Sequence, residues 1–249
     1  MFHTSGKMFK NAFGTEQMRE VFTEEAYAQR FMEVEAALAR AEADAGLIPE
    51  DAADEITRTA SLDYLDLDEV EQKIAEIDLF TVAIIQTWKE AIGPNGEYIH
   101  WGATSQDIAD MAMFLLMRDV FEVLKSDIDQ IKESLEDLTI DHADTPMMGR
   151  THHVHALPIT FGLKSSNWLD EFTRGANRLQ DAIDRVSVLQ FFGAVGSLAS
   201  IGEPGLEVQE NLAAELDVTI PNTAWYASRD RLVELLDVFA SLGDTLSRI

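Results

Sequence analysis

Three histidines within four positions make residues 147–164 (MMGRTHHVHALPITFGLK) the segment best suited to proton transfer. His152, His153 and His155 are half of the six histidines in the chain. An imidazole titrates near neutrality, so it can donate and accept protons at working pH. Pro158 suits the first turn of a helix, and we therefore expect the histidines on a loop that leads into one. Loops on rigid scaffolds often carry catalysis; the alternative is a polar loop whose histidines are only caps and surface groups.

A second polar segment, residues 100–107 (HWGATSQD), follows a strong turn signal at residues 93–96 and precedes a predicted long helix. Thr104 or Ser105 can cap that helix. Backbone N–H groups and hydroxyls at a helix N-terminus bind carboxylates well, so the segment is a candidate carboxylate site. The alternative is a plain N-cap loop.

Helical periodicity runs through almost the whole chain, and no segment is convincingly rich in β-strand residues. Thr23 is a plausible N-cap, and Gly46 suits the end of the helix that follows. Pro49 begins a second helix through Ile56. Apolar residues from 113 to 138 repeat at steps of three and four, which predicts a helix over about 105–140, on the order of 50 Å long. Further helices are predicted over residues 66–88, 169–186 and 232–249.

The last predicted helix keeps its apolar stripe up to Ile249, with no closing Gly, Pro or polar tail. We therefore expect that the chain is cut inside a third long helix; a helix completed by a partner is the alternative. Long helices with narrow apolar stripes pack as bundles, often between subunits. The predicted fold is all-α, with an N-terminal helical domain over residues 1–100 and a long-helix bundle domain over 101–249, incomplete at its C-terminal end.

Composition excludes several classes of function. The 249 residues carry 45 acidic and 19 basic side chains, a net charge of −26, which argues against nucleic-acid binding and against anionic membranes. The chain has no cysteine, so thiolate chemistry is excluded. We read no signal peptide and no membrane span, and expect a cytoplasmic protein. Spread acidic charge favours a halophilic protein from a high-salt cytoplasm over an ordinary acidic cytosolic one.

Taken together, the motifs resemble those of the fumarase/aspartase superfamily, whose members add or eliminate groups beta to a carboxylate. Residues 100–107 look like its first signature region and residues 149–164 like its second. Residues 191–200 (FFGAVGSLAS) and 225–231 (WYASRDR) follow in the family's order. Residues 13–52 are most similar to the opening helices of the 3-carboxy-cis,cis-muconate cycloisomerase branch. The resemblance implies a long-helix bundle whose central helices pack between subunits.

Adenylosuccinate lyase is the rival within the superfamily. The second region looks more like that enzyme, because the cycloisomerase branch usually carries Trp at the position of His152. Two other features differ from adenylosuccinate lyase. Residues 10–13 (KNAF) stand where a phosphate-binding Arg-Tyr-Ser is usual, and Ile77-Asp78 stands where an active-site His-Asp is usual. These differences make nucleotide chemistry less favoured, and the best prediction is the lactonising cycloisomerase.

The resemblance also implies roles for particular residues. His152 would be the general acid or the residue that orients it, and Thr151 would bind a carboxylate. His155 is a less certain neighbour, and the role of His153 is open. The other half of the carboxylate site would consist of His100, Thr104 and Ser105. Arg229 could pair with an anionic group or could only bridge helices.

The family's third region carries the serine taken as the catalytic base, and it would lie downstream of Ile249. We therefore expect the 249-residue chain alone to be inactive. The resemblance implies no metal and no organic cofactor; the histidine cluster lacks a nearby acidic ligand at helical spacing, which argues against zinc. It implies a homotetramer with active sites shared between subunits and a small polycarboxylate substrate. A non-catalytic helical assembly protein is the alternative of another class.

Overall fold

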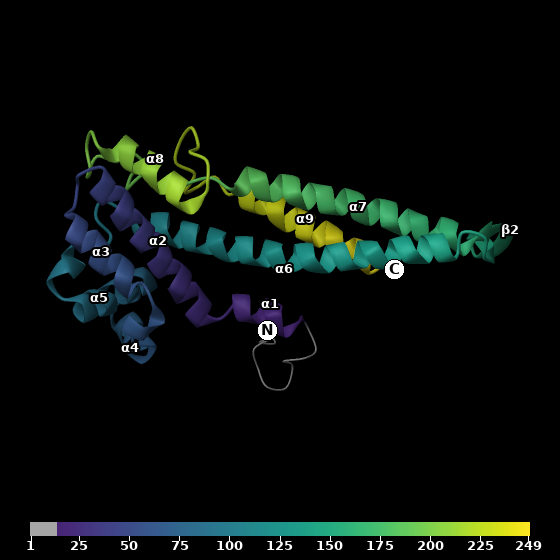
Figure 1. Cartoon of the computed structure of the whole chain (residues 1–249), viewed down its shortest axis with the longest axis horizontal. Helices are drawn as coiled ribbons and strands as arrows, with labels where there is room; N and C mark the ends of the chain where they lie inside the picture. Colours follow the sequence, from purple (N-terminus) through teal and green to yellow (C-terminus); the bar gives the residue numbers. More distant parts are fainter. Residues whose placement is uncertain (1–13) are drawn as a thin grey trace. The chain divides into compact units, whose positions relative to one another are not determined.

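The computed structural model describes residues 14–249, and it is mostly helical, which confirms the predicted all-α class (Figure 1). Residues 10–13, which the comparison with adenylosuccinate lyase used, lie outside the described residues. The helices and strands, in chain order, are α1 (Glu16–Val21), α2 (Glu24–Asp44), α3 (Glu50–Thr59), η1 (Leu62–Tyr64), α4 (Leu67–Ile77), α5 (Phe80–Ile92), η2 (Pro94–Tyr98), α6 (Ser105–Asp141), β1 (Pro146–Thr151), β2 (Val154–Thr160), α7 (Phe161–Val186), α8 (Gly205–Leu216) and α9 (Asp230–Leu246).

The described chain divides into two compact units. Unit 1 holds the residues up to Val120 together with Ser187–Ser228, and unit 2 holds Phe121–Val186 and Arg229–Ile249. Helix α6 contributes residues to both. The bounds of these units differ from those of the domains predicted over residues 1–100 and 101–249. That division into domains stays a prediction.

Unit 1 is built around α2, which packs against α3 and α8. The hydroxyl of Thr23 caps α2 by accepting from the N–H of Ala26, and Gly46 follows its end with a φ of 72°. Both sequence predictions for this helix are confirmed. The side chains of Phe31 and Met32 are fully buried, as is Trp88 of α5. Burial of such large apolar side chains stabilises the unit by about 1.5–3 kcal/mol each.

One predicted helix is in fact two. The segment over residues 66–88 was expected to be continuous, but α4 ends at Ile77 and α5 begins at Phe80. Asp78 adopts the left-handed conformation between them (φ 58°) and donates its N–H to the carbonyl oxygen of Ile74. Aspartate tolerates this conformation better than most residues, so it can end a helix where no glycine marks the end.

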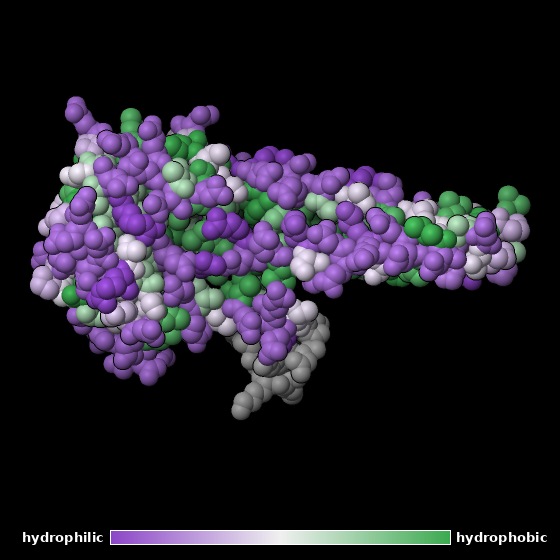
Figure 2. Space-filling model, in the orientation of Figure 1, coloured by the Kyte–Doolittle hydropathy of each residue, from purple (hydrophilic) through white to green (hydrophobic). Residues whose placement is uncertain are grey.

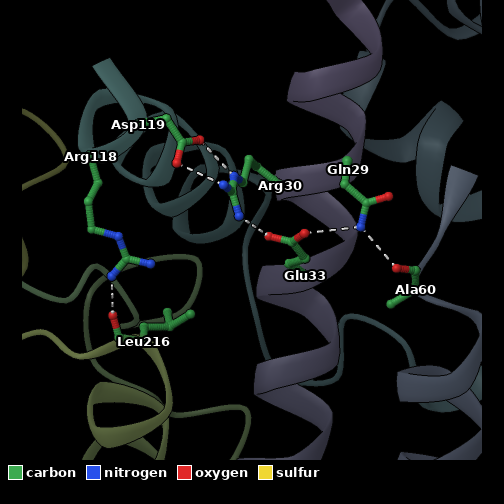
Figure 3. A network of polar contacts seen from close by, with 7 residues as sticks. All are labelled: Gln29, Arg30, Glu33, Ala60, Arg118, Asp119 and Leu216. Atoms are coloured by element: carbon green, nitrogen blue, oxygen red, sulfur yellow. Dashed lines mark hydrogen bonds and ion pairs between the residues drawn. The ribbon is translucent and has the colours of Figure 1, made fainter. Parts of the chain in front are cut away.

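Two arginines, Arg30 of α2 and Arg118 of α6 itself, hold α6 in place within unit 1 (Figure 3). Arg30 of α2 donates two parallel hydrogen bonds, of 2.9 and 2.8 Å, to the carboxylate of Asp119 on α6. Arg118 donates to the carbonyl oxygen of Leu216, at the C-terminal end of α8 (3.1 Å). Bidentate guanidinium–carboxylate pairs fix orientation as well as distance. The network therefore sets the position of the α6 segment that follows the motif of residues 100–107.

In unit 2, α7 packs against α9 (Figure 1). Gly175 lets the helices approach, because a Cβ there would lie 2.7 Å from Cδ2 of Leu242. The predicted helix over residues 105–140 is confirmed by α6. The last helix is shorter than predicted, because α9 ends at Leu246 instead of continuing through Ile249.

The prediction that the chain has no β-structure is wrong at residues 146–160. Strands β1 and β2 form an antiparallel hairpin, with a bulge opposite Gly149. Pro158 therefore lies in β2, where it pairs with Met148, and not in the first turn of a helix. Proline is tolerated there because each strand of a two-stranded sheet is an edge strand.

Hydrophilic residues cover most of the face shown in Figure 2, as expected for a chain with a net charge of −26. Apolar side chains also reach the surface of unit 2, among them Val233 and Leu236 of α9 and Leu157 of the hairpin. Within residues 14–249, no helix is both long and apolar enough to cross a bilayer.

Candidate active site

The first candidate group lies at the N-terminus of α6 in unit 1. Ser105 is the first residue of the helix, and Thr104 precedes it, with its carbonyl oxygen accepting from the N–H of Asp107 (2.9 Å). Thr104 therefore occupies the capping position that the sequence suggested. Within the described chain, the hydroxyls of both residues make no hydrogen bond, and both residues are partly exposed. These two hydroxyls and the helix N-terminus can serve a carboxylate.

Asp107 is the structural centre of this group. Its carboxylate is fully buried and accepts hydrogen bonds from the N–H groups of Thr104 (3.0 Å), Phe192 (3.1 Å) and Gly193 (3.0 Å). Tyr226 adds its phenolic hydroxyl at 2.6 Å. Burial raises the pKa of Asp107 above its ordinary value, although these hydrogen bonds favour the ionised form. The Asp107 carboxylate already accepts four hydrogen bonds within the chain. Asp107 therefore holds the surrounding loops in position, and contacts to a ligand fall to neighbouring residues.

Three of the four motifs singled out in the sequence thus converge on one carboxylate. Asp107 belongs to residues 100–107, Phe192 and Gly193 to residues 191–200, and Tyr226 to residues 225–231. We call these contacts around the Asp107 carboxylate the Asp107 junction. A neighbouring hydrogen bond also involves one of these segments. The indole N–H of Trp225 donates to the carbonyl oxygen of Leu189 at 3.0 Å.

Gly102 allows the loop before α6 to pack closely. Its φ is +68°, and a Cβ there would lie 2.3 Å from Cγ1 of Ile201. Its carbonyl oxygen accepts from the hydroxyl of Ser200 (3.1 Å). Only glycine fits both the backbone conformation and the space, so the loop is held against residues 200–201.

His100 is held by an acid that the sequence analysis did not select. The carboxylate of Glu35, on α2, accepts from the backbone N–H of His100 (3.1 Å) and contacts its Nδ1 (2.7 Å). The Glu35 side chain is 0% exposed, and that of His100 is 18% exposed. The signal in the sequence was a charged residue within the Ala-rich stretch of α2, which alone does not indicate a partner 65 residues away.

The second candidate group lies on the hairpin of unit 2. Thr151 ends β1, and His155 lies in β2 opposite Arg150. His152 and His153 are the two turn residues, with φ of 43° and 64°. Positive φ at both positions is the requirement of the turn that best matches strand twist, and histidine tolerates it better than most residues. All four side chains are exposed.

Arg229 immediately precedes α9 in unit 2 and is half-buried. The predicted site residues therefore fall into local groups. His100, Thr104 and Ser105 lie around the N-terminus of α6 in unit 1. Thr151, His152 and His155 lie on the hairpin of unit 2, and Arg229 lies at the start of α9. Tyr226 and Glu35 are additions that the sequence analysis missed. Across residues 14–249, no group of three or more His, Cys, Asp or Glu side chains is arranged to hold a metal ion.

Comparison with known proteins identifies the family. Residues 11–249 match the sequence pattern of the family described as lyase. The chain belongs to this lyase family. Its motifs are thus those of a fumarase/aspartase superfamily member, as the sequence predicts, and the mostly helical fold agrees with solved structures of the superfamily.

Three proteins of known name or structure are similar to this chain in sequence. The N-acetyl-S-(2-succino)cysteine lyase of Enterococcus italicus is 38% identical over 242 residues, covering 97% of this chain and 53% of that protein. The adenylosuccinate lyase of Methanocaldococcus jannaschii is 39% identical over 241 residues, covering 95% and 52%. The structure of the 3-carboxy-cis,cis-muconate lactonizing enzyme from Pseudomonas putida superposes with a TM-score of 0.93 at 36% identity, covering 98% and 56%.

The chain spans about half the length of the curated relatives it matches. The names of these relatives specify different substrates, although all three are similarly identical to this chain in sequence. Membership of the lyase family is therefore established, and the substrate is a separate question.

Proposed function

We propose that this chain is part of a lyase or cycloisomerase that needs no cofactor and acts beta to a carboxylate on a small polycarboxylate. The observation that carries the proposal is the convergence of three motifs on Asp107. This convergence fixes the N-terminus of α6 while the hydroxyls of Thr104 and Ser105 stay available to a ligand. Fixed donors around a helix N-terminus suit an anion whose charge grows during reaction.

The chemistry follows from that charge. A base removes the proton on the carbon next to the carboxylate, and the electron pair is delocalised into that carboxylate. Donors such as Thr104, Ser105 and His100 stabilise the resulting dianion. The electron pair then forms the carbon–carbon double bond as the leaving group departs, and a general acid protonates that group. His152 is the proposed acid, Thr151 and His155 flank it, and Arg229 is proposed to pair with a second anionic group.

The first substrate to test is 3-carboxy-cis,cis-muconate. In that case the reaction runs in the direction of addition, and an internal carboxylate adds across a double bond to give a lactone. The similarity to the Pseudomonas putida lactonizing enzyme supports this choice.

A succinyl adduct with a nitrogen or sulfur leaving group is the second candidate, because the names of two relatives specify such substrates. Among the adducts, adenylosuccinate is less favoured. Ile77-Asp78 stands where adenylosuccinate lyases usually carry His-Asp, and here Asp78 serves as a left-handed helix end.

We also propose a homotetramer with shared active sites in the cytoplasm. Exposed apolar side chains on α9, such as Val233 (52% exposed) and Leu236 (59% exposed), support an assembly. Light scattering after size exclusion tests it, and a monomer at micromolar concentration would contradict it.

The decisive experiment is an ultraviolet assay with 3-carboxy-cis,cis-muconate in high salt, using the full gene product. We expect the diene absorbance to fall with the parent protein and to persist with His152→Asn. His153→Asn is the matched control, because it changes the adjacent turn residue of the same backbone conformation. A fall only with a succinyl adduct would move the proposal to elimination. A folded protein inert toward both substrate classes would overturn it.

A further inference from the structure

Glu35 is the most buried of the ion-pairing side chains in the described part of unit 1. Glu35 lies on α2 with a fully buried side chain, and its two oxygens approach one residue. Oε2 accepts the backbone N–H of His100 at 3.1 Å, and Oε1 lies 2.7 Å from Nδ1 of its ring. A buried carboxylate is stable only when it is paired and hydrogen-bonded, so His100 is the residue that compensates Glu35.

The contact fixes more than the ring. His100 has a φ of 65°, in the left-handed region that costs a non-glycine residue conformational energy. Because the same carboxylate holds the N–H of this residue, it stabilises the backbone conformation together with the ring orientation. In the described chain, hydrogen bonds of His100 are recorded at its N–H and Nδ1, and none at Nε2.

We propose that Glu35 is a positioning residue that holds His100 as a cation with Nδ1 toward α2 and Nε2–H available to a substrate carboxylate. The proposal rests on the proposed function, in which His100 contacts that carboxylate. Glu35 itself touches no substrate, and it acts only through the orientation and charge of His100.

The charges around His100 agree with this assignment. Desolvation lowers the pKa of His100, but the charge and hydrogen bond of Glu35 raise it, and the net shift is upward. Lys89 of α5 opposes this shift, and Asp107 of α6 adds to it.

Glu42 provides a control from the same helix. It is also fully buried, and neither of its carboxylate oxygens has a hydrogen-bond partner in the described chain. Burial, with a contribution from Glu35, raises the pKa of Glu42 to about 9. A neutral acid is closely matched by glutamine, so Glu42→Gln changes a buried acid of α2 without removing a charge at neutral pH.

The test is a histidine-labelled NMR titration of the parent chain, with His100→Asn used to assign the signal. We expect Glu35→Gln to lower the pKa of His100 by roughly one to two pH units, the range for loss of an opposite charge. Glu35→Asp keeps the charge one methylene farther away and should give an intermediate value. Glu42→Gln should leave the value within about 0.3 units of the parent, well below the effect of one adjacent opposite charge.

An unchanged His100 pKa in folded Glu35→Gln would overturn the proposal, as would equal shifts in Glu35→Gln and Glu42→Gln. Circular dichroism shows whether each variant is folded; if Glu35→Gln does not fold, Glu35→Asp decides, because an unshifted pKa there also contradicts the proposal. This titration needs no substrate, so its failure is distinguishable from failure of the proposed function.

Where turnover is measured, the alkaline limb of the kcat/KM profile gives a second test. In Glu35→Gln it should move to lower pH by the same amount as the NMR pKa. A residue that only stabilised the fold would lower activity without moving that limb.

Discussion

Tyr226 donates its phenolic hydroxyl to Oδ1 of Asp107 across 119 residues of sequence, at 2.6 Å, and the phenolic oxygen of Tyr226 also lies 2.8 Å from the carbonyl oxygen of Gly193. Removing this hydroxyl leaves a buried carboxylate with one donor fewer. We expect Tyr226→Phe to lower the free energy of unfolding by about 1–3 kcal/mol. Urea denaturation measures it, with Tyr98→Phe as the control, because the Tyr98 hydroxyl has no hydrogen bond in the described chain. Equal effects would mean that the Asp107 contact adds nothing.

Glu42 should make the protein less stable in mild alkali. In the folded chain its pKa is raised to about 9 by burial, whereas the unfolded value is 4.5. Between these values the folded state holds a proton that the unfolded state releases. The contribution of protonated Glu42 to the free energy of unfolding is therefore complete below pH 4.5. It is lost as pH rises toward 9, by up to about 1.4 kcal/mol per pH unit.

Glu42→Gln cannot ionise, so its melting temperature should exceed that of the parent increasingly from pH 5 to pH 9. Glu50→Gln, an exposed change on α3, is the control and should follow the parent curve. Parallel curves for the parent and Glu42→Gln would show that Glu42 is ionised in the folded chain.

Two glycines with nearly equal φ separate conformational cost from steric cost. A Cβ added at Gly46 (φ +72°) would have nothing within 4 Å. A Cβ added at Gly102 (φ +68°) would lie 2.3 Å from Cγ1 of Ile201. We expect Gly46→Ala to cost about 1–2 kcal/mol, the price of a left-handed residue. Gly102→Ala should cost about 1–3 kcal/mol more through overpacking.

Chemical denaturation measures both substitutions. Measured in an Ile201→Ala background, Gly102→Ala should cost less than in the parent, since the clashing atoms are absent there. The steric explanation fails if the two glycine variants are equally stable.

The Arg30–Asp119 pair should contribute little and depend on salt. Both side chains are 31% exposed, and partly solvated pairs are worth about 0.2–1 kcal/mol. A double-mutant cycle with Arg30→Gln and Asp119→Asn should give a coupling energy in this range. The coupling energy should decrease when KCl is raised from 0.1 to 1 M. The more exposed pair of Lys125 and Asp129, 3.9 Å apart, should show almost none. A coupling that persists in high salt would instead indicate a desolvated pair.

The sequence predicted the features that depend on neighbours along the chain. Steps of three and four located α6 almost to its last residue, and Thr23 and Gly46 marked the ends of α2. The hairpin was missed because His152-His153 replaces the Asn-Gly that usually announces such a turn, and because Pro158 suggested a helix start.

The candidate site was predicted where residues act through local motifs, and missed where they act at a distance. Thr104 and Ser105 were identifiable as helix-start residues. Glu35 and Tyr226 were not, since their importance comes from contacts with His100, 65 residues away, and Asp107, 119 residues away. Periodicity carries no information about pairings of that length.

The Asp107 junction also constrains the order of assembly during synthesis. A ribosome releases the chain from its N-terminus, so when residue 107 emerges, Glu35 is already available to His100. Phe192, Gly193 and Tyr226 are not, as they follow 85, 86 and 119 residues later. Until then Asp107 lacks three of its four donors and must remain hydrated. The loop before α6 therefore closes in two stages, first on its histidine side and only at the end on its aspartate side.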